Sequence, residues 1–385
     1  MIQEARVEDK DIGQASIQEI TDSPHKETKI VVIGIGGGGS NMVRHLIETS
    51  MHHGVIPIVA NTDEQHLQDN PTQIKIRLGK EVTNGLGAGG DPKVGKSAAE
   101  ESADEIRKFA KGANLVIVCT GLGGGTGTGA IPVVADIAKK EGALTVAVVT
   151  KPFRNEGRDR TKKAESGLEE LKSVSDSIVV IPNEKLRSTM KPAASIDECF
   201  REVDDVLVRA VSGISGIITQ KGKVNVDFAD LRTVLGFKGF ALMGIGEAIG
   251  ENAAVTAMEN AIQSPLLDNI SINGAMGVIA CFEYPKGYPA AILWAAQDII
   301  YERAHEDSMV KFSYIERDTL PADQVRVTLI ATGSEKSKDE EPTPLENIAT
   351  ATQSTIKPRM VVNGGRIPTS EEDLDIPAYL RNQKD

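Results

Sequence analysis

The chain has 385 residues and a formal charge of −12. This length allows two or three domains, at about 100–200 residues each. The acidic surplus argues against nucleic-acid binding, because a phosphate backbone attracts basic surfaces. No apolar stretch is long enough to insert into a membrane, and no signal peptide is visible. The three cysteines lie far apart, in no Cys-x-x-Cys or Cys/His spacing, which is typical of buried side chains in a reducing compartment, so we expect a globular protein of the cytoplasm.

The first half of the chain predicts an α/β fold. Residues 1–27 are polar and unpatterned, which is typical of a flexible tail. Between residues 28 and 194, short β-branched runs alternate with helical stretches, and this order indicates a Rossmann-like parallel sheet with helices on both faces. The expected strands are Ile30–Ile33, Val55–Ala60, Leu115–Cys119, Leu144–Val149 and Ser177–Ile181, and the expected helices are Met42–Glu48, Ala98–Ala110, Val133–Lys140 and Thr161–Leu171.

A long central helix and a second, smaller α/β domain are predicted to follow. Apolar residues recur at helical spacing over residues 195–223, and Ser195 with Glu198 forms a capping box at the start of this segment. Residues 224–333 again mix strand and helix patterns. The expected helices there are Glu251–Ile262 and Pro289–Arg303, and the expected strands are Gly277–Phe282, Val310–Ile315 and Val325–Ile330.

The C-terminal residues predict a linker and a docking peptide. Residues 334–373 are too polar to bury a core, so we expect a disordered linker. The last segment, Leu374–Asp385, regains apolar side chains. An apolar segment behind a polar linker more often docks on a partner than completes a domain.

Glycine is concentrated in three loops. The loops Gly34–Gly39, Gly85–Gly90 and Gly121–Gly129 hold 15 of the 37 glycines. Such clusters are costly in entropy unless the backbone must approach a neighbour or a ligand closely. The first loop joins a strand to a helix and contains G-x-G-x-x-G, so its N–H groups predict a phosphate site. Taken alone, this loop fits a dinucleotide as well as a mononucleotide, and Asp63 lies where an acid could bind a ribose.

A formal P-loop pattern occurs at Gly90–Ser97, but its context is wrong. A P-loop follows directly on a buried strand, whereas the residues before this segment are loop. Asp91 would also place a negative charge among phosphates. We therefore interpret the segment as a loop that precedes a helix starting at Ser97.

The third glycine loop again joins a strand to a helix. A dinucleotide enzyme has one phosphate loop, whereas two such loops at the carboxyl ends of parallel strands could enclose one polyphosphate. The run Gly123–Gly129 is the signature of the tubulin and FtsZ superfamily, and the chain resembles the bacterial FtsZ family over nearly its whole length. The resemblance also covers Asn61–Asp63, Gly85–Gly90, Lys151–Gly157, Ile181–Leu186, Asn225–Asp230 and Leu374–Leu380.

The resemblance implies a GTPase domain that binds GTP or GDP together with Mg²⁺. The six histidines have no metal-ligand spacing, so we expect no metal site built from the protein alone. By resemblance, the phosphates contact Gly37, Gly38, Gly39, Ser40, Asn41, Gly124, Gly125, Thr126, Gly127 and Thr128, and the γ-phosphate faces Ala88, Gly89 and Gly90. The remaining contacts implied are Glu156 and Arg160 at the ribose, Asn183 and Asp205 as readers of guanine, and Phe200 stacked on the base.

The segment Asn225–Asp230 has two interpretations. Asp227 and Asp230 are three residues apart at a predicted helix start, where carboxylates commonly cap the helix and favour its dipole. In the FtsZ family this loop lies opposite the nucleotide. The resemblance therefore implies that Asn225, Asp227 and Asp230 complete the active site of the next subunit.

The resemblance further implies head-to-tail filaments that form the bacterial division ring. It also implies that Leu374–Asp385 binds membrane-tethering and regulatory division proteins. Two alternatives stay open: a dehydrogenase that binds NAD at Gly34–Gly39, and a tubulin-like scaffold that binds GTP without hydrolysing it. The dehydrogenase does not explain the third glycine loop, and the scaffold does not explain both acids.

Overall fold

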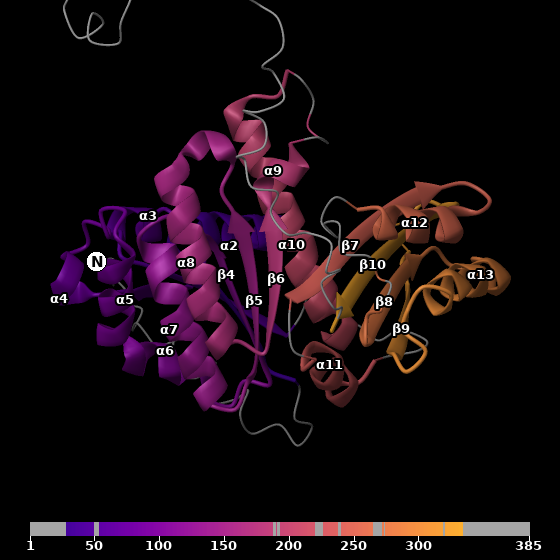
Figure 1. Ribbon diagram of the computed structural model, residues 1–385, viewed down its shortest axis with the longest axis horizontal. Helices are drawn as coiled ribbons and strands as arrows, with labels where there is room; N and C mark the ends of the chain where they lie inside the picture. Colours follow the sequence, from indigo (N-terminus) through magenta and orange to yellow (C-terminus); the bar gives the residue numbers. More distant parts are fainter. Residues whose placement is uncertain are drawn as a thin grey trace, which may run out of the picture. The chain divides into compact units, whose positions relative to one another are not determined.

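The computed structural model describes residues 28–49, 54–187, 190, 193–219, 226–237, 240–264, 272, 274–318 and 320–333 (Figure 1). Asn225 lies outside the described residues, and so do the predicted N-terminal tail, the linker and the terminal peptide. Within the described part of the chain, no helix has the length and apolar composition that a bilayer span requires.

A sheet of ten strands runs through the described residues in the order β3-β2-β1-β4-β5-β6-β7-β10-β8-β9. Strands β1 to β6 are mutually parallel, and they are rich in valine and isoleucine because helices cover both of their faces. The five strands predicted for this half are confirmed. The bounds are β1 Ile30–Ile35, β2 Val55–Asn61, β3 Ile74–Arg77, β4 Leu115–Gly121, β5 Leu144–Lys151 and β6 Ser177–Pro182.

Two helical layers cover the parallel strands. Alternate residues of β1 point into different cores: Ile30 and Val32 face one layer, and Val31 and Ile33 face the other. The first layer contains α2 (Gly36–Thr49), α10 (Ile196–Thr219) and α11 (Phe228–Leu235). The second contains α5 (Pro92–Glu101), α6 (Ala103–Ala110), α7 (Thr126–Lys140) and α8 (Arg158–Val174), and Figure 1 shows α7 and α8 beside the strands β4 to β6.

Short elements connect these layers. They are α3 (Glu64–Gln68), α4 (Lys80–Thr83), the 3₁₀ turn η1 (Arg154–Glu156) and α9 (Asn183–Leu186). The segment with the formal P-loop pattern follows α4 rather than a strand, which confirms that it is not a P-loop.

The helix expected from Ser97 begins earlier than predicted. The side chain of Asp91 accepts a hydrogen bond from the Lys93 N–H at 2.9 Å, and Pro92 occupies the first helical position. The single helix predicted over Ala98–Ala110 was also wrong, because it is divided at Ser102. The hydroxyl of Ser102 accepts a hydrogen bond from the Gly79 N–H at 3.0 Å.

The second half of the sheet contains β7 (Phe240–Ile249), β8 (Gly277–Tyr284), β9 (Met309–Glu316) and β10 (Gln324–Thr332), with α12 (Ala253–Ile262) and α13 (Ala290–Tyr301) packed on one face. Strand β10 is antiparallel to β7 and β8. The predicted strands and helices of this half are confirmed, but β7 was missed. Its glycines weaken the strand pattern, and Gly246 is required because a Cβ there would lie 1.9 Å from the Ala257 carbonyl oxygen.

Strand β7 also pairs with β6, so the sheet is continuous between the two halves. The predicted domain limits at residues 194 and 223 therefore stay predictions.

Candidate nucleotide site

Three glycine loops meet at the carboxyl ends of the parallel strands. Gly36 has φ +68°, and a Cβ on it would lie 2.9 Å from the backbone nitrogen of Gly127. A Cβ on Gly125 would lie 2.8 Å from the backbone nitrogen of Asp91. Because the loops touch through their backbones, side chains are excluded at these points and N–H groups are brought together.

A cavity of about 450 Å³ opens between these loops and α10. The first turn of α2 lies at one side of the cavity, and its N–H groups have no partner within the helix. Two of the glycine loops reach the cavity directly. The predicted residues that line it are Gly37, Gly38, Asn41, Gly124, Gly125, Thr126, Gly127, Glu156, Arg160, Asn183 and Phe200.

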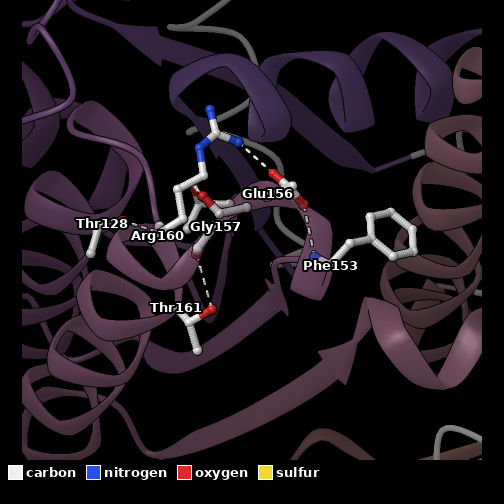
Figure 2. Close-up of polar contacts among 9 residues, drawn as sticks. Thr128, Phe153, Glu156, Gly157, Arg160 and Thr161 are labelled. Atoms are coloured by element: carbon white, nitrogen blue, oxygen red, sulfur yellow. Dashed lines mark hydrogen bonds and ion pairs between the residues drawn. The ribbon is translucent and has the colours of Figure 1, made fainter. Parts of the chain in front are cut away.

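Glu156 and Arg160 face each other at the cavity wall. Figure 2 shows one carboxylate oxygen of Glu156 paired with the Arg160 guanidinium, while the other accepts a hydrogen bond from the Phe153 N–H at 2.8 Å. The Glu156 side chain is 17% exposed and that of Arg160 is 54% exposed. A carboxylate has about four acceptor positions, so Glu156 keeps the capacity to accept from sugar hydroxyls.

Asn183 and Phe200 form the part of the cavity that suits a base. Asn183 is buried, and its side-chain oxygen has no hydrogen-bond partner among the described residues. A buried acceptor without a donor is costly, so this oxygen fits a ligand that brings an N–H group. Phe200 is 43% exposed and packs edge-on against Phe153, with 5.8 Å between ring centroids. Its exposed ring at the cavity fits a planar ligand.

The acid of α10 that lines the cavity is not the one predicted as a reader of guanine. Asp204 lines the cavity and Asp205 does not. The Asp205 carboxylate pairs instead with the imidazole of His45 on α2. Burial raises the pKa of Asp204 to about 7, while nearby His45 lowers it and nearby Asp205 raises it further.

The helical spacing of the sequence is sufficient to place Asp204 on the same helix face as Phe200. Side chains three and four residues apart share one face of a helix. Phe200, Val203, Asp204 and Leu207 have this spacing, and all four line the cavity. Asp205 is five residues from Phe200 and therefore points away from this face.

Several other predicted residues support the loops without lining the cavity. Thr128 accepts a hydrogen bond from the Gly123 N–H at 2.8 Å and so closes the third loop on itself. Gly90 accepts through its carbonyl from Lys163 at 2.9 Å. Apart from Asp205, the predicted contacts outside the lining are Gly39, Ser40, Thr128, Ala88, Gly89 and Gly90. Of these, Ser40 is fully buried, and its hydroxyl has no hydrogen-bond partner among the described residues.

The remaining acid considered from the sequence, Asp63, is a helix cap. Its carboxylate accepts a hydrogen bond from the His66 N–H at 3.1 Å, at the start of α3. Asp63 does not line the cavity, so it gives no support to a dinucleotide site.

Asp227 and Asp230 lie on the side of the sheet where the parallel strands begin, whereas the cavity lies where these strands end. Arg232 of the same helix, α11, donates to the carbonyl of Gly142, which precedes the first residue of β5. The cavity is lined by Thr150 near the other end of β5. The two acids therefore cannot reach the cavity of their own chain.

Asp227 and Asp230 also differ from each other. Asp227 caps α11, because its carboxylate accepts a hydrogen bond from the Asp230 N–H at 2.6 Å. The Asp230 carboxylate lies 2.8 Å from the ammonium of Lys311 in β9. The capping interpretation holds for Asp227, and it leaves Asp230 as the acid that does not cap the helix.

A divalent ion would have few protein ligands here. The part of the chain that the structure describes contains no group of three or more histidine, cysteine or acidic side chains placed to hold a metal. The carboxylates that line the cavity are Glu156 and Asp204. This donor set fits Mg²⁺ only as an ion held chiefly by phosphate oxygens and water.

Glycine loops at the carboxyl ends of a parallel sheet, with a base-sized pocket beside them, define a nucleotide-binding α/β protein. The Tubulin/FtsZ family GTPase-domain model matches residues 29–191, and the FtsZ family C-terminal-domain model matches residues 239–335. The cell division protein FtsZ of Helicobacter pylori (strain J99) is 58% identical over 388 residues, with 100% of both chains covered.

Two more distant relatives support the same family assignment. The cell division protein FtsZ of Neisseria gonorrhoeae is 39% identical over 387 residues, which cover 95% of this chain and 98% of that protein. A solved structure of an FtsZ dimer from M. jannaschii has a TM-score of 0.76 and 41% identity, covering 83% of this chain and 92% of that one. The chain belongs to the FtsZ family, and it is a GTP-binding GTPase of cell division.

Proposed function

We propose that the chain hydrolyses GTP at the interface, or joint, between two subunits stacked head to tail. The observation that carries this proposal is the separation of two parts within one chain. The cavity has donors for phosphate, and its lining carboxylates among the described residues, Glu156 and Asp204, are assigned to the sugar and the base. Asp227 and Asp230 lie at the start of α11, outside the lining of the cavity. Stacking would bring the two parts together.

The phosphate end requires little covalent chemistry from the protein. Phosphoryl transfer is accelerated mainly by positioning and by compensation of charge. The N–H groups of α2 and of Gly124–Gly127 would hold the phosphates, and Glu156 with Arg160 would hold the ribose. Bound Mg²⁺ would supply positive charge to the phosphate oxygens. The carboxylate of Asp230 would accept a hydrogen bond from the attacking water.

Guanine selection is assigned to Asp204 and Asn183. The N1–H and 2-amino groups of guanine present donors side by side, and adenine lacks this pair. A carboxylate and an unpartnered amide oxygen supply matching acceptors. Leaving such buried acceptors unpaired would cost about 1–3 kcal/mol, which disfavours ATP.

Complementation between two inactive variants tests the shared site. Asp230→Asn binds GTP but lacks the acid, and Asn183→Ala/Asp204→Ala keeps the acid but binds GTP poorly. If the site is shared, mixing them restores phosphate release, because the acid of one subunit meets the GTP of the other. A mixture no more active than its two components added together would overturn the shared site. Normal binding of GTP without any phosphate release by the unmodified chain would support the scaffold alternative.

A head-to-tail joint also accounts for filaments. Such a contact joins two different surfaces, so it does not close and can extend indefinitely. The M. jannaschii relative is described as a dimer. We infer that this chain forms homopolymers in the cytoplasm that organise the division ring at midcell, and sedimentation with GTP, with GDP and without nucleotide tests this. Equal sedimentation under all three conditions would contradict GTP-dependent assembly.

We assign the terminal segment Leu374–Asp385 to the binding of membrane-tethering and regulatory division proteins. Its apolar side chains follow a polar linker and resemble the family's terminal peptide. Truncation before Leu374 should leave GTP turnover and sedimentation unchanged while abolishing recruitment to the division site in cells. A lowered melting temperature with unchanged recruitment would mean that the segment belongs to the globular body.

A further inference from the structure

The ion pair between Lys311 and Asp230 connects α11 to the second half of the sheet. The Lys311 ammonium lies 2.8 Å from one carboxylate oxygen of Asp230, and the two side chains are 36% and 28% exposed. The hydrogen bond to Asp230 and the negative charges of Asp230 and Asp227 raise the pKa of Lys311. The lysine is therefore charged at neutral pH.

Lys311 belongs to β9, the strand at the end of the sheet order, and is partly exposed there. Val310, Phe312 and Tyr314 pack against the core beneath α12 and α13. Met309 and Ile315 alternate with them and belong to the core that contains α11. Lys311 lies on this second face of the strand. On this face Lys311 lies between Met309 and the buried Ser313, and its ammonium extends to the start of α11.

At the proposed joint, the negative charges of the α11 acids would be repelled by the GTP of the neighbouring subunit. Asp227 and Asp230 would approach a triphosphate that carries several negative charges of its own. Like charges at close range repel strongly when water is excluded. Asp227 is held in place as the helix cap, and the cation that lies against Asp230 is Lys311 of β9.

We propose that Lys311 is a positioning residue for GTP hydrolysis, which holds Asp230 by one carboxylate oxygen and offsets its charge against the triphosphate of the next subunit. This inference rests on the proposed role of Asp230 at the joint. The contact uses Oδ1 of Asp230, so Oδ2 stays available to accept a hydrogen bond from the attacking water. The ammonium also restricts the rotamers of Asp230, which a positioned acceptor requires.

Three variants of the full chain test this role. Lys311→Met removes the charge but keeps an apolar stem, and Lys311→Arg keeps the charge. Arg317→Met is the matched control, because it breaks another partly exposed ion pair of the same half, Arg317 with Glu283. GTP turnover is measured per sedimented subunit over a range of GTP and NaCl concentrations, together with GTP affinity of the unassembled chain.

We expect Lys311→Met to lower kcat about tenfold with unchanged GTP affinity of the unassembled chain. Lys311→Arg should retain at least half of kcat, and Arg317→Met should match the parent. Combining Lys311→Met with Asp230→Asn should give no loss beyond that of Asp230→Asn alone, because both changes act on one unit. Turnover of Lys311→Met within twofold of the parent would overturn the proposal, and so would an equal loss in Arg317→Met.

Asp230→Asn separates the two possible failures. If Asp230→Asn loses turnover while Lys311→Met keeps it, only the role of Lys311 is wrong. If Asp230→Asn itself turns over GTP at the parent rate, the proposed joint is wrong and the inference about Lys311 falls with it.

Discussion

The cavity lies at the carboxyl ends of the parallel strands and the start of α11 lies toward their amino ends, and the two regions are built in different ways. The cavity draws on distant segments that pack backbone against backbone, and its one buried unpartnered amide oxygen, among the residues described there, belongs to Asn183. The start of α11 has two acids within a single turn, partly exposed and held by a cap and by Lys311. In the proposed function, the first region binds the nucleotide and the second supplies the acids that act on it. The proposal therefore predicts that substitutions in the two regions affect binding and turnover separately.

The largest effect should come from the α11 region and should leave binding intact. We expect Asp230→Asn and Asp227→Ala to reduce GTP turnover about 10²–10³-fold, the usual cost of losing a group that acts in the transition state. GTP affinity should change by less than about twofold, because neither acid lines the cavity. Phosphate release and equilibrium binding measure the two quantities.

A control for lost charge is Asp298→Asn, on the surface of α13. It should behave like the parent in both measurements. Parent-like turnover in Asp230→Asn would remove the distinction between the two regions.

The second effect should be confined to the cavity. Asp204→Asn should weaken GTP binding about 10- to 100-fold, as expected for the loss of a charged hydrogen bond worth roughly 1.5–3 kcal/mol. Asp205→Asn is the matched control, since it changes the neighbouring residue in the same way but outside the cavity. It should change GTP affinity less than threefold. The reverse order of effects would restore Asp205 as the reader of guanine.

This pair of aspartates also shows what the sequence could and could not predict. The sheet, its flanking helices and the glycine loops follow from hydrophobic runs and local punctuation, so they were predicted well. The four-residue spacing of Asp204 from Phe200 places both on one helix face, whereas the resemblance points to its neighbour Asp205. The ion pair of Asp230 with Lys311 could not have been predicted, since it joins residues 81 positions apart through the register of β9 and the packing of α11.

A third effect concerns pH and the cavity alone. Burial raises the pKa of Asp204 to about 7, from an ordinary value of 3.8. Below pH 7 the free protein therefore carries a proton on Asp204, which must be lost before both guanine donors can be accepted. GTP affinity should fall by up to about tenfold per pH unit below 7. In Asp204→Asn this slope should disappear, and an unchanged slope would assign it to another group.

The same shift predicts the sign of a change in stability. In the unfolded chain Asp204 ionises near its ordinary pKa, but in the folded chain it keeps its proton to about pH 7. Folding stability from this group is therefore present at pH 4 and is lost as the pH rises through 7. Asp204→Asn should raise the melting temperature of the nucleotide-free protein at pH 8 and leave it nearly unchanged at pH 4. An increase of the same size at both pH values would exclude titration as the cause.

The smallest effect should come from the cap of α11, and it separates stability from chemistry in that region. Asp227 accepts the Asp230 N–H at 2.6 Å, so Asp227→Ala leaves that N–H without its partner. Losing such a cap lowers the free energy of unfolding by about 1 kcal/mol. For a domain of about 150–250 residues, this corresponds to a melting temperature lower by roughly 2–4 °C. Asp227→Ser keeps a capping oxygen and should melt close to the parent. If Asp227→Ala and Asp227→Ser melt together, the hydrogen bond does not stabilise α11, and the acid is held at this position by its role toward the neighbouring subunit alone.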